Sequence, residues 1–143
     1  MSEHRIVVVQ FCDDVRHEVG NKYSLMGCYA DELIVDKLPV VLPKLCAQIR
    51  AITPIDNFFS KLTFRAKIND DIIAELNIDI NKLPDPVPTN SELRRYTVVA
   101  AMSFSPLLIA EPCQLRIEAE TEDGVIIPGG SLKIRERLPE DPV

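Results

Sequence analysis

The sequence predicts an all-β domain, folded as a two-sheet antiparallel sandwich of the immunoglobulin-like type with about seven to nine strands. Three observations lead to this prediction. Apolar and polar residues alternate with a period of two in several segments, as they do in strands that bury one face. Clusters of Pro, Gly, Asn and Asp interrupt these segments at intervals of about ten residues. Long segments with the apolar spacing of an amphipathic helix are absent from the sequence.

The N-terminal third is expected to contain four strands. The β-branched run at 5–12 predicts a strand that is buried on both faces, and 23–30 predicts the next strand. The polar stretch 13–22 between them contains a Gly-Asn pair and is expected to be a loop. Shorter apolar runs predict further strands at 33–35 and 45–52.

Prolines mark two connections between the predicted strands. Segment 38–43 contains Pro39 and Pro43, and it is expected to be apolar connecting chain that crosses between the sheets. Segment 83–90 contains three prolines, which exclude both a helix and an inner strand. We expect this second segment to be a long connection on the surface.

The clearest pattern lies at 61–80, where alternating residues flank a polar turn and predict a hairpin with one buried face. A three-residue loop at 69–71 sets Phe64 opposite Leu76. A slip of one residue would turn the charged side chains into the core, so they help to fix this register. The same register predicts three further pairs: Leu62 with Ile78, Arg65 with Glu75, and Lys61 with Asp79.

The C-terminal third is expected to contain three more strands, at 94–104, 113–120 and 125–137. The Asp-Gly pair at 123–124 predicts a tight turn between the last two strands. The Gly-Gly pair at 129–130 predicts a bend within the last strand.

The overall composition is that of an ordinary acidic globular protein. With 143 residues, the chain is expected to form one domain over 1–138 and a flexible C-terminal tail over 139–143. The formal net charge is −6, so neither nucleic acid nor an anionic membrane is expected as a partner. Because the sequence has no long apolar segment and no secretory signal, the expected location is cytoplasmic.

The four cysteines are Cys12, Cys28, Cys46 and Cys113, and all lie in or beside apolar segments. Their spacing forms no CxxC pair and matches no zinc module. Reduced cysteine acts as a small hydrophobic residue in such places, so structural thiols are expected and no metal or cofactor is expected. A disulfide is expected only in an oxidising compartment.

The densest group of chemically active side chains lies at 12–18. It contains a thiol, an imidazole and three carboxylates, but it matches neither the HExxH pattern nor a calcium loop. The simplest interpretation is a solvated turn in which Asp side chains cap backbone amides. The candidate binding residues are Asp13, Asp14, Arg16, His17, Glu18 and Lys22.

The sequence predicts that this protein is not an enzyme. Only two histidines, His4 and His17, are present, and His4 lies close to the start of the chain. The sequence contains no GxSxG nucleophile pattern, no GxGxxG fingerprint and no phosphate-binding glycine loop.

Three stretches near the N-terminus form a recognisable pattern: DDVR at 13–16, NKYSLMGCY at 21–29, and the paired Leu-Pro steps at 38–43 that lead to LC at 45–46. This pattern resembles a family of uncharacterised bacterial and phage proteins, a domain of unknown function with a GKLSLIGIY-like strand and an LP..LP.L connection. Lys22 and Gly27 stand where the family has Lys and Gly, whereas Asn21 replaces its usual Gly. The resemblance covers about the first 50 residues well and about the last 30 loosely. It implies a β-sandwich and implies no activity.

Two functions remain open on the sequence. The first is a non-enzymatic protein-interaction domain, encoded by a phage or mobile element, which binds a host protein or forms a homodimer through an edge strand. The second is a calcium- or small-ligand-binding sandwich that uses acidic loops at one end. Convergence of Asp13, Asp14 and a third acidic loop within about 6 Å would favour calcium.

Overall fold

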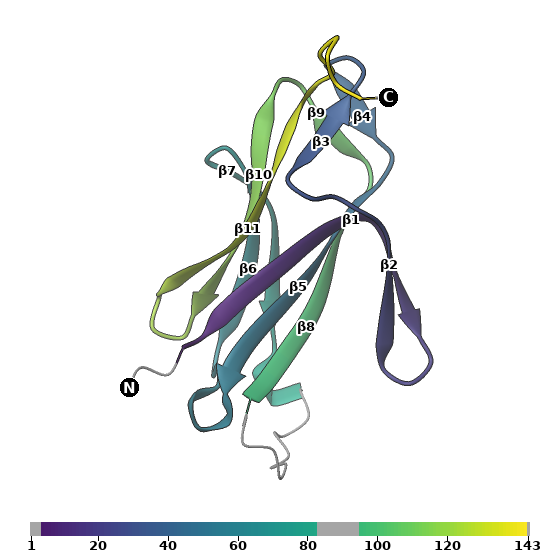
Figure 1. Ribbon diagram of the computed structural model, residues 1–143. Coiled ribbons are helices and arrows are strands. Elements are labelled where there is room, and N and C mark those ends of the chain that lie inside the picture. Colours follow the sequence, from purple (N-terminus) through teal and green to yellow (C-terminus); the bar gives the residue numbers. More distant parts are fainter. Residues whose placement is uncertain (1–3, 83–94, 143) are drawn as a thin grey trace.

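Eleven strands in three sheets make up the described part of the chain, residues 4–82 and 95–142, in a computed structural model (Figure 1). The all-β prediction is confirmed, but the strands are more numerous than the predicted seven to nine, and they form three sheets where two were predicted. Two short 3-10 turns, η1 (Ile55–Asn57) and η2 (Ile80–Lys82), complete the elements. Among these residues no helix is long and apolar enough to cross a bilayer. The connection predicted at 83–90 lies outside the described residues.

The first sheet is antiparallel and contains β1 (Ile6–Glu18), β2 (Lys22–Cys28), β5 (Leu45–Pro54) and β8 (Arg95–Phe104), in the order β2-β1-β5-β8. The long strand β1 pairs with two neighbours in succession. From Ile6 to Cys12 it pairs with β5, and from Cys12 to Glu18 it pairs with β2. The sheet therefore changes direction at Cys12, and the β1–β2 ribbon curls away from β5 (Figure 1).

The second sheet contains β3 (Glu32–Val35), β6 (Leu62–Ile68), β7 (Asp71–Ile78), β10 (Cys113–Thr121) and β11 (Ile126–Glu136), in the order β3-β11-β10-β6-β7. Its pairs are antiparallel except for β3 and β11, which run parallel. The turn between β10 and β11 contains Gly124 with φ of 75°, a left-handed conformation that glycine adopts without strain. The predicted Asp-Gly turn is confirmed.

A small third sheet joins β4 (Val40–Leu42) to β9 (Leu107–Ile109). The prediction that 38–43 is only connecting chain is therefore wrong. Pro39 and Pro43 flank β4 and do not interrupt it, so the three residues between them are free to pair. The central pair, Val41 and Leu108, is exposed on both strands.

The hairpin predicted at 61–80 is confirmed as β6 and β7. Phe64 lies opposite Leu76, and the pairs Leu62–Ile78 and Arg65–Glu75 also match the predicted register. The ladder ends at Leu62–Ile78, so the predicted pair Lys61–Asp79 is not part of it. The predicted three-residue loop is wrong: Ile68 pairs with Asp71 across a two-residue turn, and a β-bulge between Ala66 and Lys67 restores the register.

The core lies between the inner faces of the two larger sheets. In β5 the inward residues Ala47, Ile49 and Ala51 are fully buried, and in β10 Leu115 and Ile117 meet the same core. Burial of alternate residues is what the period-two patterns predict. The largest fully buried apolar side chains are Phe59, Phe64, Leu45, Ile49, Leu62, Ile109, Leu115, Ile117, Leu132 and Ile134.

Gly129 and Gly130 on β11 allow the second sheet to approach β1 of the first sheet closely. A Cβ atom on Gly129 would lie 2.8 Å from Cγ2 of Val9 and 2.9 Å from the backbone oxygen of Ile117. The same region carries a β-bulge, since Ile117 pairs with Gly130 and the next residue of β10 pairs with Pro128. The absence of a side chain at Gly129 therefore brings β11 against β1 and closes this side of the fold. The bend predicted at 129–130 corresponds to this β-bulge between β10 and β11.

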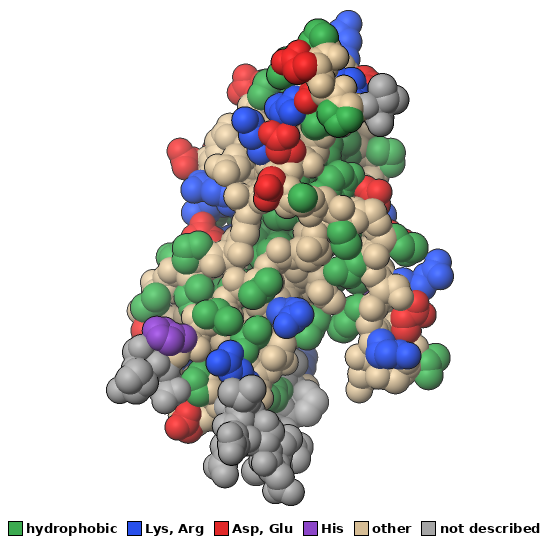
Figure 2. Space-filling view, viewed as in Figure 1, with side chains coloured by type: hydrophobic (Ala, Val, Ile, Leu, Met, Phe, Trp, Pro, Cys, Tyr) green, Lys and Arg blue, Asp and Glu red, His purple; other side chains and the backbone are tan. Residues whose placement is uncertain are grey.

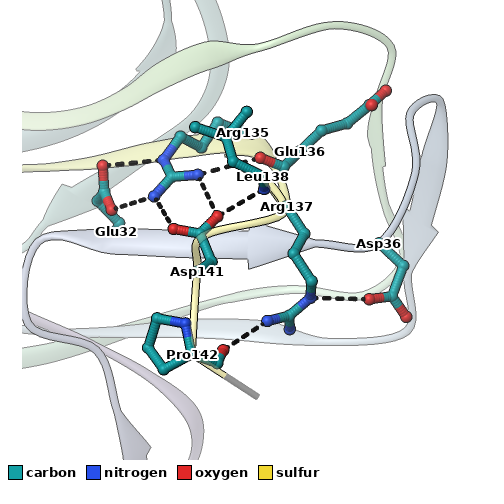
Figure 3. A network of polar contacts seen from close by, with 8 residues as sticks. All are labelled: Glu32, Asp36, Arg135, Glu136, Arg137, Leu138, Asp141 and Pro142. Carbon is teal, nitrogen blue, oxygen red and sulfur yellow. Dashed lines mark hydrogen bonds and ion pairs between the residues drawn. The ribbon is translucent and has the colours of Figure 1, made fainter.

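The C-terminal residues fold back onto the second sheet, as Figure 3 shows. Arg135 on β11 donates hydrogen bonds to both carboxylate oxygens of Glu32 on β3, at 3.1 and 3.0 Å. It also donates to both oxygens of Asp141, at 2.8 and 3.0 Å. Arg137 donates to Asp36 at 3.2 Å. The tail predicted to be flexible is thus in contact with the domain as far as Pro142, whose carbonyl oxygen accepts a hydrogen bond from Arg137.

Candidate functional site

The six candidate residues lie on a projecting ribbon. Beyond Cys12, β1 pairs with β2 and with no other described strand, so residues 13–28 form a two-stranded arm with its tip at 19–21 (Figure 1). The prediction of a loop at 13–22 is wrong, because residues 13–18 continue β1. At the tip Gly20 and Asn21 have φ of 87° and 58°, values that glycine and asparagine tolerate in tight turns.

Asp13 is bound to a tyrosine at the root of the arm. The hydroxyl of Tyr29 donates a hydrogen bond to its carboxylate at 2.5 Å. Burial raises the pKa of Tyr29 to about 12, and Asp13 adds to the shift because its charge disfavours a tyrosinate. A Cβ atom on Gly27 would lie 2.2 Å from Oδ2 of Asp13, so only glycine leaves room for this carboxylate.

Asp14 is bound to a lysine outside the arm. Its Oδ1 lies 2.7 Å from Nζ of Lys44, the residue before β5. The hydrogen bond from Lys44 lowers the pKa of Asp14, and the same contact raises the pKa of Lys44. This ion pair connects the arm to the start of β5. Both side chains are substantially exposed, so its stabilising effect is small.

The other candidate residues lie further along the arm. The rings of His17 and Tyr23, which face each other across the ribbon, have centroids 4.7 Å apart. Glu18 accepts a hydrogen bond from Ser24 at 2.7 Å. Arg16 and Lys22 are exposed.

The structure does not gather these residues into one cluster. Asp13 and Asp14 are consecutive in a strand, so their side chains leave opposite faces, and each is bound to a different partner. Over residues 4–82 and 95–142, no group of three or more His, Cys, Asp or Glu side chains is arranged to hold a metal ion. The arrangement that would favour calcium is therefore not found in these residues.

A groove separates the arm from β8. It encloses about 400 Å³ and is lined on the arm by residues that include His17, Lys22 and Tyr23, and on β8 by Thr97 and Val99. The space-filling view shows the corresponding indentation between the arm and the body of the domain (Figure 2). Sequence reasoning missed this groove because it depends on the curl of the arm toward a strand far away in the sequence.

The outer edge of β8 borders this groove. β8 is the last strand of its sheet, and no described strand pairs with its second edge. Residues 96–104 contain no charged side chain and no proline, the features by which edge strands usually avoid pairing with other chains. The other edge strands differ: β7 carries Asp71 and Glu75 beside a bulge, β3 has four residues, and β2 lies on the arm.

Hydrogen bonding identifies the backbone groups on this edge. The N–H of Tyr29 donates to the carbonyl of Phe11 at 2.9 Å, which makes Cys12–Cys28 a non-hydrogen-bonded pair of the ladder. Cys12 therefore directs its backbone groups toward β5, and the alternation continues through the regular β5–β8 register. Along β8 the residues whose backbone groups point away from β5 are Thr97, Val99, Ala101 and Ser103.

Three of the cysteines lie in one row across three strands. Cys12 pairs with Cys28 on one side and with Cys46 on the other. Cys46 in turn pairs with Ser103, and its thiol donates a weak hydrogen bond to that hydroxyl at 3.6 Å. The spacing of the cysteines in the sequence could not predict this row, because turns and a long connection separate them along the chain.

Comparison with known proteins found no matching family model, curated protein or solved structure. The resemblance of the N-terminal pattern to an uncharacterised bacterial and phage family therefore stays a prediction.

Proposed function

We propose that this protein is a non-enzymatic, immunoglobulin-like interaction domain that binds an extended segment of a partner protein by adding it as a strand to β8. The observation that carries this proposal is the outer edge of β8, with which no strand of the described residues pairs. Its outward N–H and C=O groups, at Val99 and Ala101 among others, are arranged as a template for a further strand.

The groove provides contacts for the side chains of such a segment. Thr97 and Val99 lie on the face of β8 opposite the buried Val98, and the arm lies across from them with Tyr23 and His17. A bound strand would direct every second side chain toward this groove. The lining favours small or apolar side chains there, with a polar group near Lys22.

The arm also favours a single extended segment over a second copy of the domain. It lies beside β8, and residues of both line one groove of about 400 Å³. One extended chain can enter this space, whereas edge-to-edge pairing of two whole sheets must also accommodate two arms. A partner's peptide segment is therefore the proposed occupant.

A proline on the edge of β8 tests the proposal. The N–H of Val99 points away from β5, so Val99→Pro removes a donor that the sheet itself does not use. Linear peptides would be selected from a displayed library against the wild-type chain and then titrated against both proteins. We expect Val99→Pro to weaken their binding by about tenfold or more, whereas Val99→Thr, which keeps the donor, leaves binding within about twofold.

Hydrogen exchange of the wild-type complex gives the second measurement. Bound peptide should slow exchange at the amides of Val99 and Ala101. Peptides that bind Val99→Pro as tightly as the wild type, or that protect amides elsewhere, would overturn the proposal. A concentration-dependent dimer that is lost in Val99→Pro would show that the edge binds a second copy, and would overturn the choice of occupant.

A further inference from the structure

We infer that Cys28 and Cys12 form a peroxide-sensitive thiol pair that closes a disulfide at the root of the arm, with Cys46 as a competing third thiol. The basis is the row of three reduced cysteines on neighbouring strands. This inference is independent of whether β8 binds a peptide.

The ladder geometry suits a bond between Cys12 and Cys28. They are directly opposite in a non-hydrogen-bonded pair, as the bond from Tyr29 to Phe11 shows. Such pairs have Cα atoms about 4.5 Å apart and side chains on the same face, within the range of about 4.4–6.8 Å found in disulfides. Cys12 and Cys46 form the alternate, hydrogen-bonded kind of pair, in which the Cα atoms are about 5.5 Å apart and the side chains are less close.

Exposure assigns different roles to the three thiols. Cys28 is exposed, whereas Cys12 and Cys46 have exposed fractions of 0% and 3%. Neither buried thiol belongs to the core cluster, because strand alternation places them on the opposite face of the sheet from Phe11 and Ala47. An oxidant in solution therefore meets Cys28 first, and Cys12 is the protected neighbour that can resolve the oxidised form.

The proposed chemistry uses hydrogen peroxide as the oxidant. The Cys28 thiolate attacks one peroxide oxygen, the O–O bond breaks, and a sulfenic acid and hydroxide are formed. The Cys12 thiolate then attacks the Cys28 sulfur, so an S–S bond forms, the S–O bond breaks and hydroxide leaves. The two hydroxides, one from each step, take up the two protons that the thiols lost when they became thiolates. In sum, two thiols and one peroxide give one disulfide and two waters.

The surroundings of Cys12 determine the pH dependence of the second step. Burial raises the pKa of Cys12 to about 11, and the neighbouring Cys46, Cys28 and Asp13 add to the shift. Only a small fraction of Cys12 is thiolate at neutral pH. The closing step should therefore become about tenfold faster for each pH unit between pH 7 and 9.

Oxidation of the full chain with hydrogen peroxide, followed by alkylation and peptide mass spectrometry, tests the inference. The expected product is an intramolecular Cys12–Cys28 disulfide in the wild type and in the matched control Cys113→Ser, whose thiol lies outside the row. Cys28→Ser, a change at an exposed position, should abolish it. Cys46→Ser should retain it.

A dimedone label separates the two steps. In Cys12→Ser the Cys28 sulfenic acid should persist and be labelled, and circular dichroism would confirm that this buried substitution still folds. If Cys12→Ser does not fold, the pH dependence of disulfide formation in the wild type provides the test. A disulfide that joins two chains through Cys28, or peroxide oxidation of Cys28 to sulfinic acid without a Cys12 bond, would overturn the inference.

Discussion

Arg135 donates two hydrogen bonds, of 2.8 and 3.0 Å, to the carboxylate of Asp141. This ion pair holds the C-terminal residues against the parallel strands β3 and β11. The contact lowers the pKa of Asp141 to about 2, chiefly through the hydrogen bonds from Arg135. Because Arg135 also binds Glu32, the guanidinium joins three separate segments of the chain (Figure 3).

This pair predicts a dependence of stability on pH. The pKa of Asp141 is lower in the folded state than the ordinary value of 3.8 for an aspartate, so its stabilising effect is complete above about pH 4 and is lost as the pH falls toward 2. Asp141→Asn should lower the melting temperature at pH 7. The difference from the wild type should shrink between pH 4 and pH 2, as followed by circular dichroism.

Asp123→Asn is the matched control for this measurement, because Asp123 lies in the β10–β11 turn, away from Arg135 and its two carboxylate partners. Its effect on the melting temperature should be small and should not follow the same pH profile. An Asp141→Asn protein as stable as the wild type at pH 7 would show that the C-terminal contact does not support the fold.

Gly129 should be intolerant of a side chain. In Gly129→Ala the new methyl group would lie 2.9 Å from the backbone oxygen of Ile117 and 2.8 Å from Cγ2 of Val9. The Ile117 oxygen belongs to the backbone of β10 and cannot rotate away, and the Val9 side chain lies on β1, so β11 must shift from both strands. We expect a loss of about 1–3 kcal/mol in the free energy of unfolding. Denaturant unfolding would measure it.

Gly124→Asn provides the contrast. A Cβ atom at Gly124 would meet no atom of the described residues within 4 Å, and asparagine tolerates the positive φ of this turn better than most other residues. This variant should lose less stability than Gly129→Ala. The reverse order would mean that the approach of β1 and β11 is not the tight contact described above.

The sequence predicted those elements whose local pattern and turn agree. In the β6–β7 hairpin, the alternation and the polar turn encode the same register, so Phe64 and Leu76 were placed correctly opposite each other. The arm was missed because both of its faces carry polar residues and little of it is buried. Its turn at Gly20 was visible, and reading it as a hairpin would have placed Cys28 opposite Cys12.

The remaining features depend on contacts between distant segments. Nothing local to Cys46 indicates that β5 pairs with β1 at Cys12, and nothing local to Arg135 indicates that Glu32 lies beside it. The groove beside Val99 likewise requires the arm to curl toward β8. Of the six candidate residues that sequence reasoning proposed on the arm, only His17, Glu18 and Lys22 line this groove, and nothing in the sequence indicated that β8 forms its other side.

A buried threonine should be replaceable with a gain in stability. Thr53 is 1% exposed, and its hydroxyl has no hydrogen-bond partner among the described residues. Thr53→Val keeps the shape and removes a buried polar group, so we expect a gain of about 1 kcal/mol in the free energy of unfolding. The matched control is Thr63→Val, because Thr63 is also buried but donates a hydrogen bond to Asn77 at 2.7 Å. Chemical denaturation should show opposite signs for the two variants, and a loss in both would indicate that the Thr53 hydroxyl is satisfied.

Amide hydrogen exchange should alternate along β8 in the unliganded protein. The N–H groups of Val98 and Ala100 point toward β5 and are bonded within the sheet, whereas those of Val99 and Ala101 point toward the outer edge. We expect the outward pair to exchange faster by about tenfold or more, as measured residue by residue by NMR. Uniformly slow exchange along the strand would show that the edge is already covered in solution. The template for an added strand would then be absent, because the same backbone donors cannot serve two partners.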